Sequence, residues 1–175
     1  HITEKENLVH LHSDDTIFVG KKVFNSIFDP SIIATLPEFP YLKQHFIGWF
    51  VKTEIPVFDD KKATFMDFTV DQKGNTRFMY VLPTTSYEAL VEYTLFSEHL
   101  LNKSEYESEI KQYLSKLGIS DYIITETEMG DIPMTSYPFE RHNTSNLLHI
   151  GSAGGWTKAS TGYTFASTTR KTKEL

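Results

Sequence analysis

The sequence contains no cysteine, which excludes disulfide bonds and thiol catalysis and fits a reducing compartment. It also lacks both common phosphate-binding fingerprints, G-x-G-x-x-G and G-x-x-x-x-G-K-[ST]. A surplus of basic residues is missing too, and the formal net charge of −6 argues against a nucleic-acid partner. The longest notable apolar run, FIGWFV, is strand-sized and too short to span a membrane. What is present is a chain of 175 residues, 39% hydrophobic and 14% aromatic, which suits one domain or a piece of a larger one.

Runs rich in β-branched and aromatic residues predict an antiparallel sheet. These runs are HFIGWFVKTEI, ATFMDFTV, RFMYVLPT and EALVEYTLF, with a hairpin turn predicted at DQKGN. Residues 7–28 predict short strands joined at SDD and GKK. The three prolines of DPSIIATLPEFPYL indicate an irregular segment with one helical turn.

One helix is predicted over residues 105–117. Ser104 and Glu107 have the spacing of a capping box, and Gly118 is placed to end the helix. Its apolar face is expected to contain Tyr106, Ile110, Leu114 and Leu117. After it, DYIITETEMGDIPM predicts a strand, NLLHI a buried strand and STGYTFASTTRK a second helix.

Four of the nine glycines lie in HIGSAGGWTKASTGYTF, between the last predicted strand and the last predicted helix. One interpretation is a generous connection between the two elements. The other is a ligand loop, because glycine lets the backbone approach a ligand and a helix N-terminus can face an anion. The accompanying serines and threonines favour the ligand loop.

Two acidic residues stand among apolar and aromatic neighbours. Strand alternation places Glu92 on one face with Leu90, Thr94 and Phe96. Glu92 is then either a partly solvated carboxylate or a buried acid whose pKa is raised enough to deliver a proton. Asp67 is similarly paired, at a sheet edge, or functional. No metal site is expected, because His10 and His12 share a strand face without a third ligand at recognisable spacing.

Five ordered motifs between about residues 40 and 166 resemble the lycopene cyclase family of flavoproteins. FMYVLPTTSYEALVEYT is similar to the family's Y-x-x-P-x-S-x-x-x-x-[LF]-[LI]-E-[ED]-T and aligns Glu92 with its conserved acid, whereas Tyr93 replaces the second acid. QHFIGWFVKTE, ATFMDFTV and EMGDIPM resemble Q-x-x-G-W, F-M-D-[WF] and E-x-G-x-[IL]-P-M. GSAGGWTKASTGYTF resembles the flavin strap G-x-x-[AG]-G-x-x-x-P-[ST]-T-G-Y, with Lys158-Ala159 where the family commonly has His-Pro.

The resemblance implies an α+β fold with an antiparallel substrate-domain sheet and a packed helix. It adds a returning strand, glycine loop and helix of a hydroxylase-like FAD-binding (Rossmann-type) domain. Residues 1–40 would connect from the FAD domain, 41–140 would form the substrate-binding part, and 141–175 would return to the FAD domain. The residues expected to contact FAD are Gly151, Ser152, Gly154, Gly155, Ser160, Thr161 and Gly162.

The implied reaction is cyclisation of the ends of lycopene to β-ionone rings, without net redox change. Glu92 would be the acid, with Asp67 next in line, and reduced FAD would be a non-redox cofactor kept reduced by NADPH or NADH. Substrate contacts are expected from Phe65, Tyr80, Phe96 and Trp49.

Two alternatives remain: a related FAD-dependent reductase or hydroxylase, and a non-catalytic domain that binds lipid or pigment. The chain begins at His1 and stops at TRKTKEL within a predicted helix. We therefore expect a fragment without the N-terminal dinucleotide-binding unit, inactive in isolation. The parent enzyme is expected to be cytoplasmic and peripheral to the membrane that holds its carotenoid.

Overall fold

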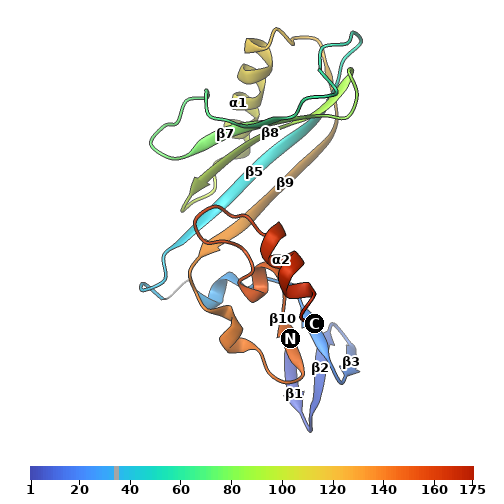
Figure 1. Ribbon diagram of the computed structural model, residues 1–175, viewed down its shortest axis with the longest axis vertical. Helices are drawn as coiled ribbons and strands as arrows, with labels where there is room; N and C mark the ends of the chain where they lie inside the picture. The colour runs from blue at the N-terminus through green and yellow to red at the C-terminus, as the bar shows by residue number, and fades with distance from the viewer. Residues whose placement is uncertain (34–35) are drawn as a thin grey trace. The chain divides into compact units, whose positions relative to one another are not determined.

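The computed structural model describes residues 1–33 and 36–175, and the chain divides into two compact units (Figure 1). Unit 1 combines His1–Tyr41 with Pro133–Leu175, and unit 2 is Leu42–Ile132. The first and last segments expected from the sequence therefore fall in the same unit.

Unit 2 is built on a sheet whose described residues form five strands in the order β6-β7-β8-β5-β9. Figure 1 shows β7, β8, β5 and β9 side by side. The strands are β5 (Tyr41–Lys52), β6 (Thr64–Asp67), β7 (Arg77–Pro83), β8 (Glu88–Ser97) and β9 (Ile123–Thr135). The pairs β6–β7, β7–β8 and β5–β8 are antiparallel, as the sequence predicted. The expected α+β class is thereby confirmed.

Helix α1 (Lys103–Lys116) packs on one face of this sheet and closes the core of unit 2. Its buried face includes Tyr106, Ile110 and Leu114, as expected from their helical spacing. The strands contribute alternate residues to the same core, because successive side chains of a strand point to opposite faces. On β8, for example, Val91 and Leu95 are fully buried in it.

The start of α1 is corrected by the structure: the N-cap is Asn102, not Ser104. The Glu105 carboxylate accepts a hydrogen bond from the Asn102 backbone N–H at 3.4 Å. The sequence holds two overlapping polar-x-x-Glu patterns, and asparagine and serine are comparable N-caps, so the pattern alone favoured the wrong one. At the other end Leu117 follows the helix and is 50% exposed, so it does not belong to the buried face.

A buried histidine joins α1 to the sheet. The Tyr106 hydroxyl lies 2.6 Å from Nδ1 of His45, and Nε2 of His45 lies 2.7 Å from the Ser97 hydroxyl. Ser97 in turn donates to the His99 carbonyl, and Tyr106 accepts from the Leu101 N–H. A neutral imidazole with its proton on Nε2 satisfies every one of these groups. The pKa of His45 is lowered to about 4, chiefly because the imidazole is buried.

We predict that His45 makes the protein less stable in mild acid. Its pKa is lowered from 6.5 to about 4 on folding, so the unfolded chain takes up the proton first as the pH falls through this window. The stabilisation is complete above pH 6.5 and is lost toward pH 4, an effect on the order of 3 kcal/mol. Urea unfolding at several pH values should show this slope in the wild type and a reduced slope in His45→Gln.

The control is His99→Gln, which removes an exposed imidazole and should leave the slope unchanged. Equal slopes in wild type and His45→Gln would contradict the assignment of a neutral buried imidazole.

Unit 1 contains two small sheets. Strands β1 (Ile2–Lys5), β2 (Leu8–Ser13) and β3 (Thr16–Gly20) form an antiparallel sheet in that order. Strand β4 (Val23–Asn25) pairs in parallel with β10 (Leu147–His149). The strands expected within residues 7–28 are therefore present, and the last predicted strand returns to pair with the first segment of the chain.

The irregular segment after β4 contains the predicted helical turn, a 3₁₀ helix at Pro30–Ile32. The same prediction covered residues 34–35, which lie outside the described residues. A second 3₁₀ helix, Phe139–His142, precedes β10.

Helix α2 (Phe165–Thr172) begins later than the sequence predicted. Gly162 adopts a φ of +69°, a left-handed conformation that a helix cannot include. The N–H of Gly162 donates to the Lys158 carbonyl, and the N–H of Lys158 donates to the Tyr163 carbonyl. The residues expected to form the first turn of the helix therefore form a closed loop.

Candidate active site

The candidate site lies on the face of the unit 2 sheet opposite α1. Leu90, Glu92, Thr94 and Phe96 alternate along β8 with the core residues that face the helix. The register pairs Glu92 with Tyr80 of β7 on one side and with Gly48 of β5 on the other. The carboxyl group thus sits in the middle of the sheet, between an aromatic ring and a glycine.

Aromatic rings cover this face beside Glu92. The centroid of the Phe78 ring lies 5.2 Å from that of Tyr80 and 5.7 Å from that of Phe96, and both pairs of rings meet edge to face. Phe65 of β6 continues the row at 5.3 Å from Tyr80 and is 72% exposed. The structure therefore brings together three predicted substrate contacts, Phe65, Tyr80 and Phe96, on the face that carries Glu92.

Glu92 is partly buried and has the environment of a weak acid. Its pKa is raised to about 7, chiefly by burial and in addition by the neighbouring Glu128 carboxyl. The Thr94 hydroxyl donates to Oε1 of Glu92 at 2.6 Å, which orients the carboxyl group and partly opposes the rise. A carboxyl group with this pKa is partly protonated at neutral pH and can act as a general acid. The exposure of Glu92 is intermediate between the two interpretations left open by the sequence, and its raised pKa is the property that the role of an acid requires.

Glu128 is a site residue that sequence reasoning missed. It lies on β9, two strands away from Glu92, and its side chain passes over Gly48. A Cβ atom at position 48 would lie 3.1 Å from Cγ and 3.2 Å from Oε1 of Glu128, so glycine makes this approach possible. Two signals for it were present in the sequence. Glu128 is the acid of EMGDIPM, which resembles the family's E-x-G-x-[IL]-P-M, and Gly48 inside a strand indicates a close approach.

The structure places Asp67 on the side of α1, away from the aromatic row, as a paired carboxylate. Its register partner is Met79, which is fully buried in the core, and its Oδ2 accepts from the Tyr113 hydroxyl of α1 at 2.7 Å. Hydrogen bonds from Tyr113 and Thr69 outweigh burial and lower the pKa of Asp67. This carboxylate is ionised and structural, so it does not provide a substitute acid beside Glu92.

Trp49 is also separated from the other predicted substrate contacts. It is 2% exposed and belongs to the core under α1, with the Tyr122 ring centroid at 6.5 Å. Its register partner is Val91, which points away from the face of Glu92. We therefore assign Trp49 to the core.

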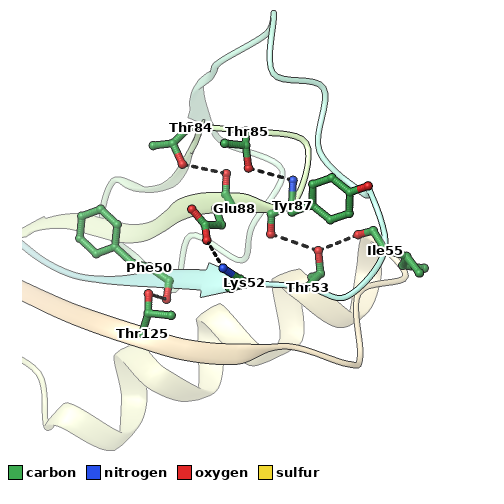
Figure 2. Close-up of polar contacts among 9 residues, drawn as sticks. All are labelled: Phe50, Lys52, Thr53, Ile55, Thr84, Thr85, Tyr87, Glu88 and Thr125. Carbon is green, nitrogen blue, oxygen red and sulfur yellow. Dashed lines mark hydrogen bonds and ion pairs between the residues drawn. The ribbon is translucent and has the colours of Figure 1, made fainter.

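The end of the sheet next to this face is fixed by polar contacts (Figure 2). Lys52 and Glu88, paired across β5 and β8, form an ion pair at 2.7 Å. The Thr53 hydroxyl donates to the carbonyls of Ile55 and Tyr87 at 2.8 and 3.2 Å. These groups border a cleft of about 740 Å³ and are already engaged with one another. The ion pair is consistent with the register, in which Lys52 lies opposite Glu88 and Gly48 lies opposite Glu92.

The glycine loop of unit 1 has a conformation that requires its glycines. Gly151, Gly155 and Gly162 all have positive φ, at +59°, +67° and +69°. At Gly154 a Cβ atom would lie 2.2 Å from the His149 carbonyl oxygen, so any larger residue would clash with the backbone. The positive φ values and the close backbone contact arise within the loop itself. The glycines alone therefore do not distinguish a simple connection from a ligand-binding loop.

The hydroxyl groups of the loop divide into two sets. The Ser152 hydroxyl lies 3.1 Å from that of Thr157, so this pair is engaged within the loop. Ser160 and Thr161 are exposed. A Cβ atom at Gly151 would meet nothing within 4 Å, so the backbone there is open to an approaching group.

A cleft of about 440 Å³ adjoins the loop. Its lining includes Gly155, Trp156, Thr157, Lys158, Tyr163, Arg170 and Lys171. An aromatic ring, hydroxyl groups and basic side chains in one cleft fit the mixed polar and planar surface of a flavin nucleotide. The donor set is therefore compatible with the expected cofactor.

Among the described residues, no group of three or more side chains has the arrangement of a metal site. In the same part of the chain, each helix is too short or too polar to cross a bilayer.

Solved structures of other proteins share this fold, and two of them illustrate the similarity. A geranylgeranyl bacteriochlorophyll reductase-like protein from Thermoplasma acidophilum matches with a TM-score of 0.62 and 14% identity, over 95% of this chain and 44% of that protein. A putative protoporphyrinogen oxidase from an Exiguobacterium species matches with a TM-score of 0.52 and 10% identity, over 99% of this chain and 45% of that one. The chain spans less than half the length of either protein, and at these identities the likeness concerns the fold alone.

The family is established by sequence. The family described as lycopene cyclase protein matches residues 2–175, and the chain therefore belongs to the lycopene cyclase family. This confirms the resemblance drawn from the five motifs. No curated protein matches the sequence significantly.

Proposed function

We propose that the protein cyclises the ends of a linear carotene, lycopene, to β-ionone-type rings, with Glu92 as the proton donor. The observation that supports this proposal most is the position of Glu92, a carboxyl group with a pKa of about 7 beside a row of aromatic rings. Family membership supplies the substrate class.

Glu92 transfers its proton to the terminal double bond of the substrate, and the carbocation that forms is attacked by a neighbouring double bond to close the ring. Loss of a ring proton to a base completes the reaction, so the product has the formula of the substrate. Aromatic faces such as those of Phe65 and Tyr80 stabilise positive charge. Water must be kept from this face during the reaction, because it would otherwise trap the cation.

The glycine loop would hold FAD. Gly151, Gly154, Gly155 and Gly162 shape its backbone, and Ser160 and Thr161 offer exposed hydroxyl groups. The Ser152 hydroxyl would exchange its contact with Thr157 for one with the cofactor. When bound in its reduced form, kept so by NADPH or NADH, the flavin supplies negative charge that stabilises cationic species. With a hydrocarbon substrate, the protein would work as a cytoplasmic enzyme at the membrane surface.

A reductase on the same scaffold is the alternative that the fold likeness favours. The two functions differ in the mass of the product, because reduction adds hydrogen and cyclisation does not. The full-length protein should be incubated with lycopene, FAD and NADPH, and the products analysed by chromatography and mass spectrometry. Rings at unchanged mass support the proposal, and products heavier by hydrogen support the reductase.

A further inference from the structure

Glu92 and Glu128 meet across an intervening strand, which is unusual for side chains of a sheet. Glu92 is on β8 and Glu128 on β9, and β5 runs between them. At the point of crossing β5 presents Gly48, the register partner of Glu92. The Glu128 side chain occupies the space that a side chain at position 48 would take, and so reaches the Glu92 carboxyl group.

Among the described residues that face Glu92, Glu128 is the charged group that has no ion-pair partner. Strand β7 presents the Tyr80 ring, and β5 presents Gly48. On β8 itself, Thr94 donates a hydrogen bond, and Glu88, four residues away, is ion-paired with Lys52. Strand β9 contributes Glu128.

We propose that Glu128 is a positioning residue for the proton donor: Glu92 and Glu128 share one proton over Gly48, and Glu128 thereby keeps Glu92 in its acidic form. The assignment of a catalytic role to this pair rests on the proposed function, whereas the pair itself rests on the geometry.

Glu128 is the acid of EMGDIPM, the segment that resembles the family's E-x-G-x-[IL]-P-M, so the two carboxyl groups come from two different motifs. In the family's E-[ED]-T triplet the second position is Tyr93 here, and its hydroxyl accepts from Arg77 at 3.1 Å on the core side of the sheet. Adjacent strand residues point to opposite faces, so even a carboxylate at position 93 would point away from Glu92. Glu128 brings the second carboxyl group to the correct face from another strand.

Two close carboxyl groups in an apolar setting cannot both ionise without repulsion, and one proton is retained between them. The elevated pKa of Glu92, to which the Glu128 carboxyl contributes, agrees with this arrangement. Charge and hydrogen bonding act in the same direction. Substitution of Glu128 by glutamine removes the charge and adds an N–H donor, which favours the ionised form of Glu92.

The test is a direct titration of Glu92 by carbon NMR in protein labelled at the glutamate carboxyl carbon, with Glu92→Gln used for assignment. In Glu128→Gln we expect the midpoint of Glu92 to fall by about one pH unit or more. The matched control is Glu126→Gln, which removes the same charge from an exposed position on the same strand and should leave the midpoint in place. An unchanged midpoint in Glu128→Gln, or equal shifts in both variants, would overturn the pair.

Gly48→Ala gives a second, independent test with both carboxyl groups retained. The added methyl group would lie 2.8 Å from Leu90 and 3.1 Å from Glu128, so Glu128 must move away. The Glu92 midpoint should again fall, and a midpoint equal to that of the wild type would contradict the proposal.

The pH profile of cyclisation reports the functional part. Activity that requires protonated Glu92 declines as the pH rises, and in Glu128→Gln this decline should move to lower pH together with the NMR midpoint. A merely structural role would lower activity without moving the profile. If the midpoint shifts but the full-length protein does not cyclise lycopene, the pair stands and the proposed function falls.

Discussion

Replacement of Glu92 by glutamine is expected to reduce the conversion of lycopene by about 10²–10⁴-fold, the range of a general-acid contribution. The substitution keeps the shape of the side chain and removes the transferable proton. Folding should be retained, because the raised pKa of Glu92 means that its ionised form is disfavoured in the folded state. Initial rates of the full-length protein, with flavin content and thermal unfolding recorded in parallel, measure the effect.

The same variant also tests how Glu92 makes the stability of the protein depend on pH. The pKa of Glu92 is raised from 4.5 to about 7, so its contribution to stability is complete below pH 4.5 and is lost as the pH rises through about 7. Glu92→Gln should therefore remove the loss of stability that the wild type shows as the pH rises from 4.5 to about 7.

Glu98→Gln is the control for activity, because Glu98 is exposed and lies beyond the end of β8. It should convert lycopene at nearly the wild-type rate. A Glu92→Gln variant that does the same would show that the proton comes from another group.

Replacement of Trp49 by alanine is expected to lower the free energy of unfolding by about 3–5 kcal/mol, the usual loss for a large aromatic residue removed from a core. Trp49 is 2% exposed and packs beneath α1, so its loss leaves a cavity between the sheet and the helix. Urea unfolding monitored by circular dichroism measures the change.

Phe65→Ala is the matched comparison, because Phe65 is 72% exposed on the opposite face. Its effect on stability should stay within about 0.5–1 kcal/mol. The KM for the carotenoid should rise instead, if Phe65 contacts the substrate. A small stability loss for Trp49→Ala, with a raised KM, would return Trp49 to the substrate site.

The strands of unit 2 could be predicted because their residues carry the signal locally. β-Branched and aromatic runs and the DQKGN turn are sufficient to place β6, β7 and β8. The alternation on β8 likewise separated Glu92 from the residues that face α1. The local pattern does not predict which residues of different strands lie opposite one another.

Trp49 and Glu128 illustrate the importance of register. Nothing in the sequence fixes Gly48 opposite Glu92, because β5 and β8 are separated by β6 and β7 in the chain. Without that register, Trp49 cannot be assigned to a face, and the reach of Glu128 over Gly48 cannot be foreseen.

The face of Asp67 could not be predicted for another reason, a β-bulge. The register shifts between Thr64 and Asp67, and Met66 has a φ of +55°. Simple alternation places Asp67 on the same face as Phe65, but the extra residue turns it to the core side. A bulge formed by a methionine has no sequence signature of the kind that glycine gives.

The proton source is the central claim, and deuterium incorporation tests it most directly. In D₂O the Glu92 carboxyl group exchanges its proton for deuterium before the substrate binds, and protonation of the double bond then places this deuterium in the ring. Products formed from lycopene by the full-length protein should gain one deuterium for each ring, and Glu92→Gln should form almost no labelled product. Rings that form without deuterium, or labelled rings formed at wild-type rate by Glu92→Gln, would contradict the account.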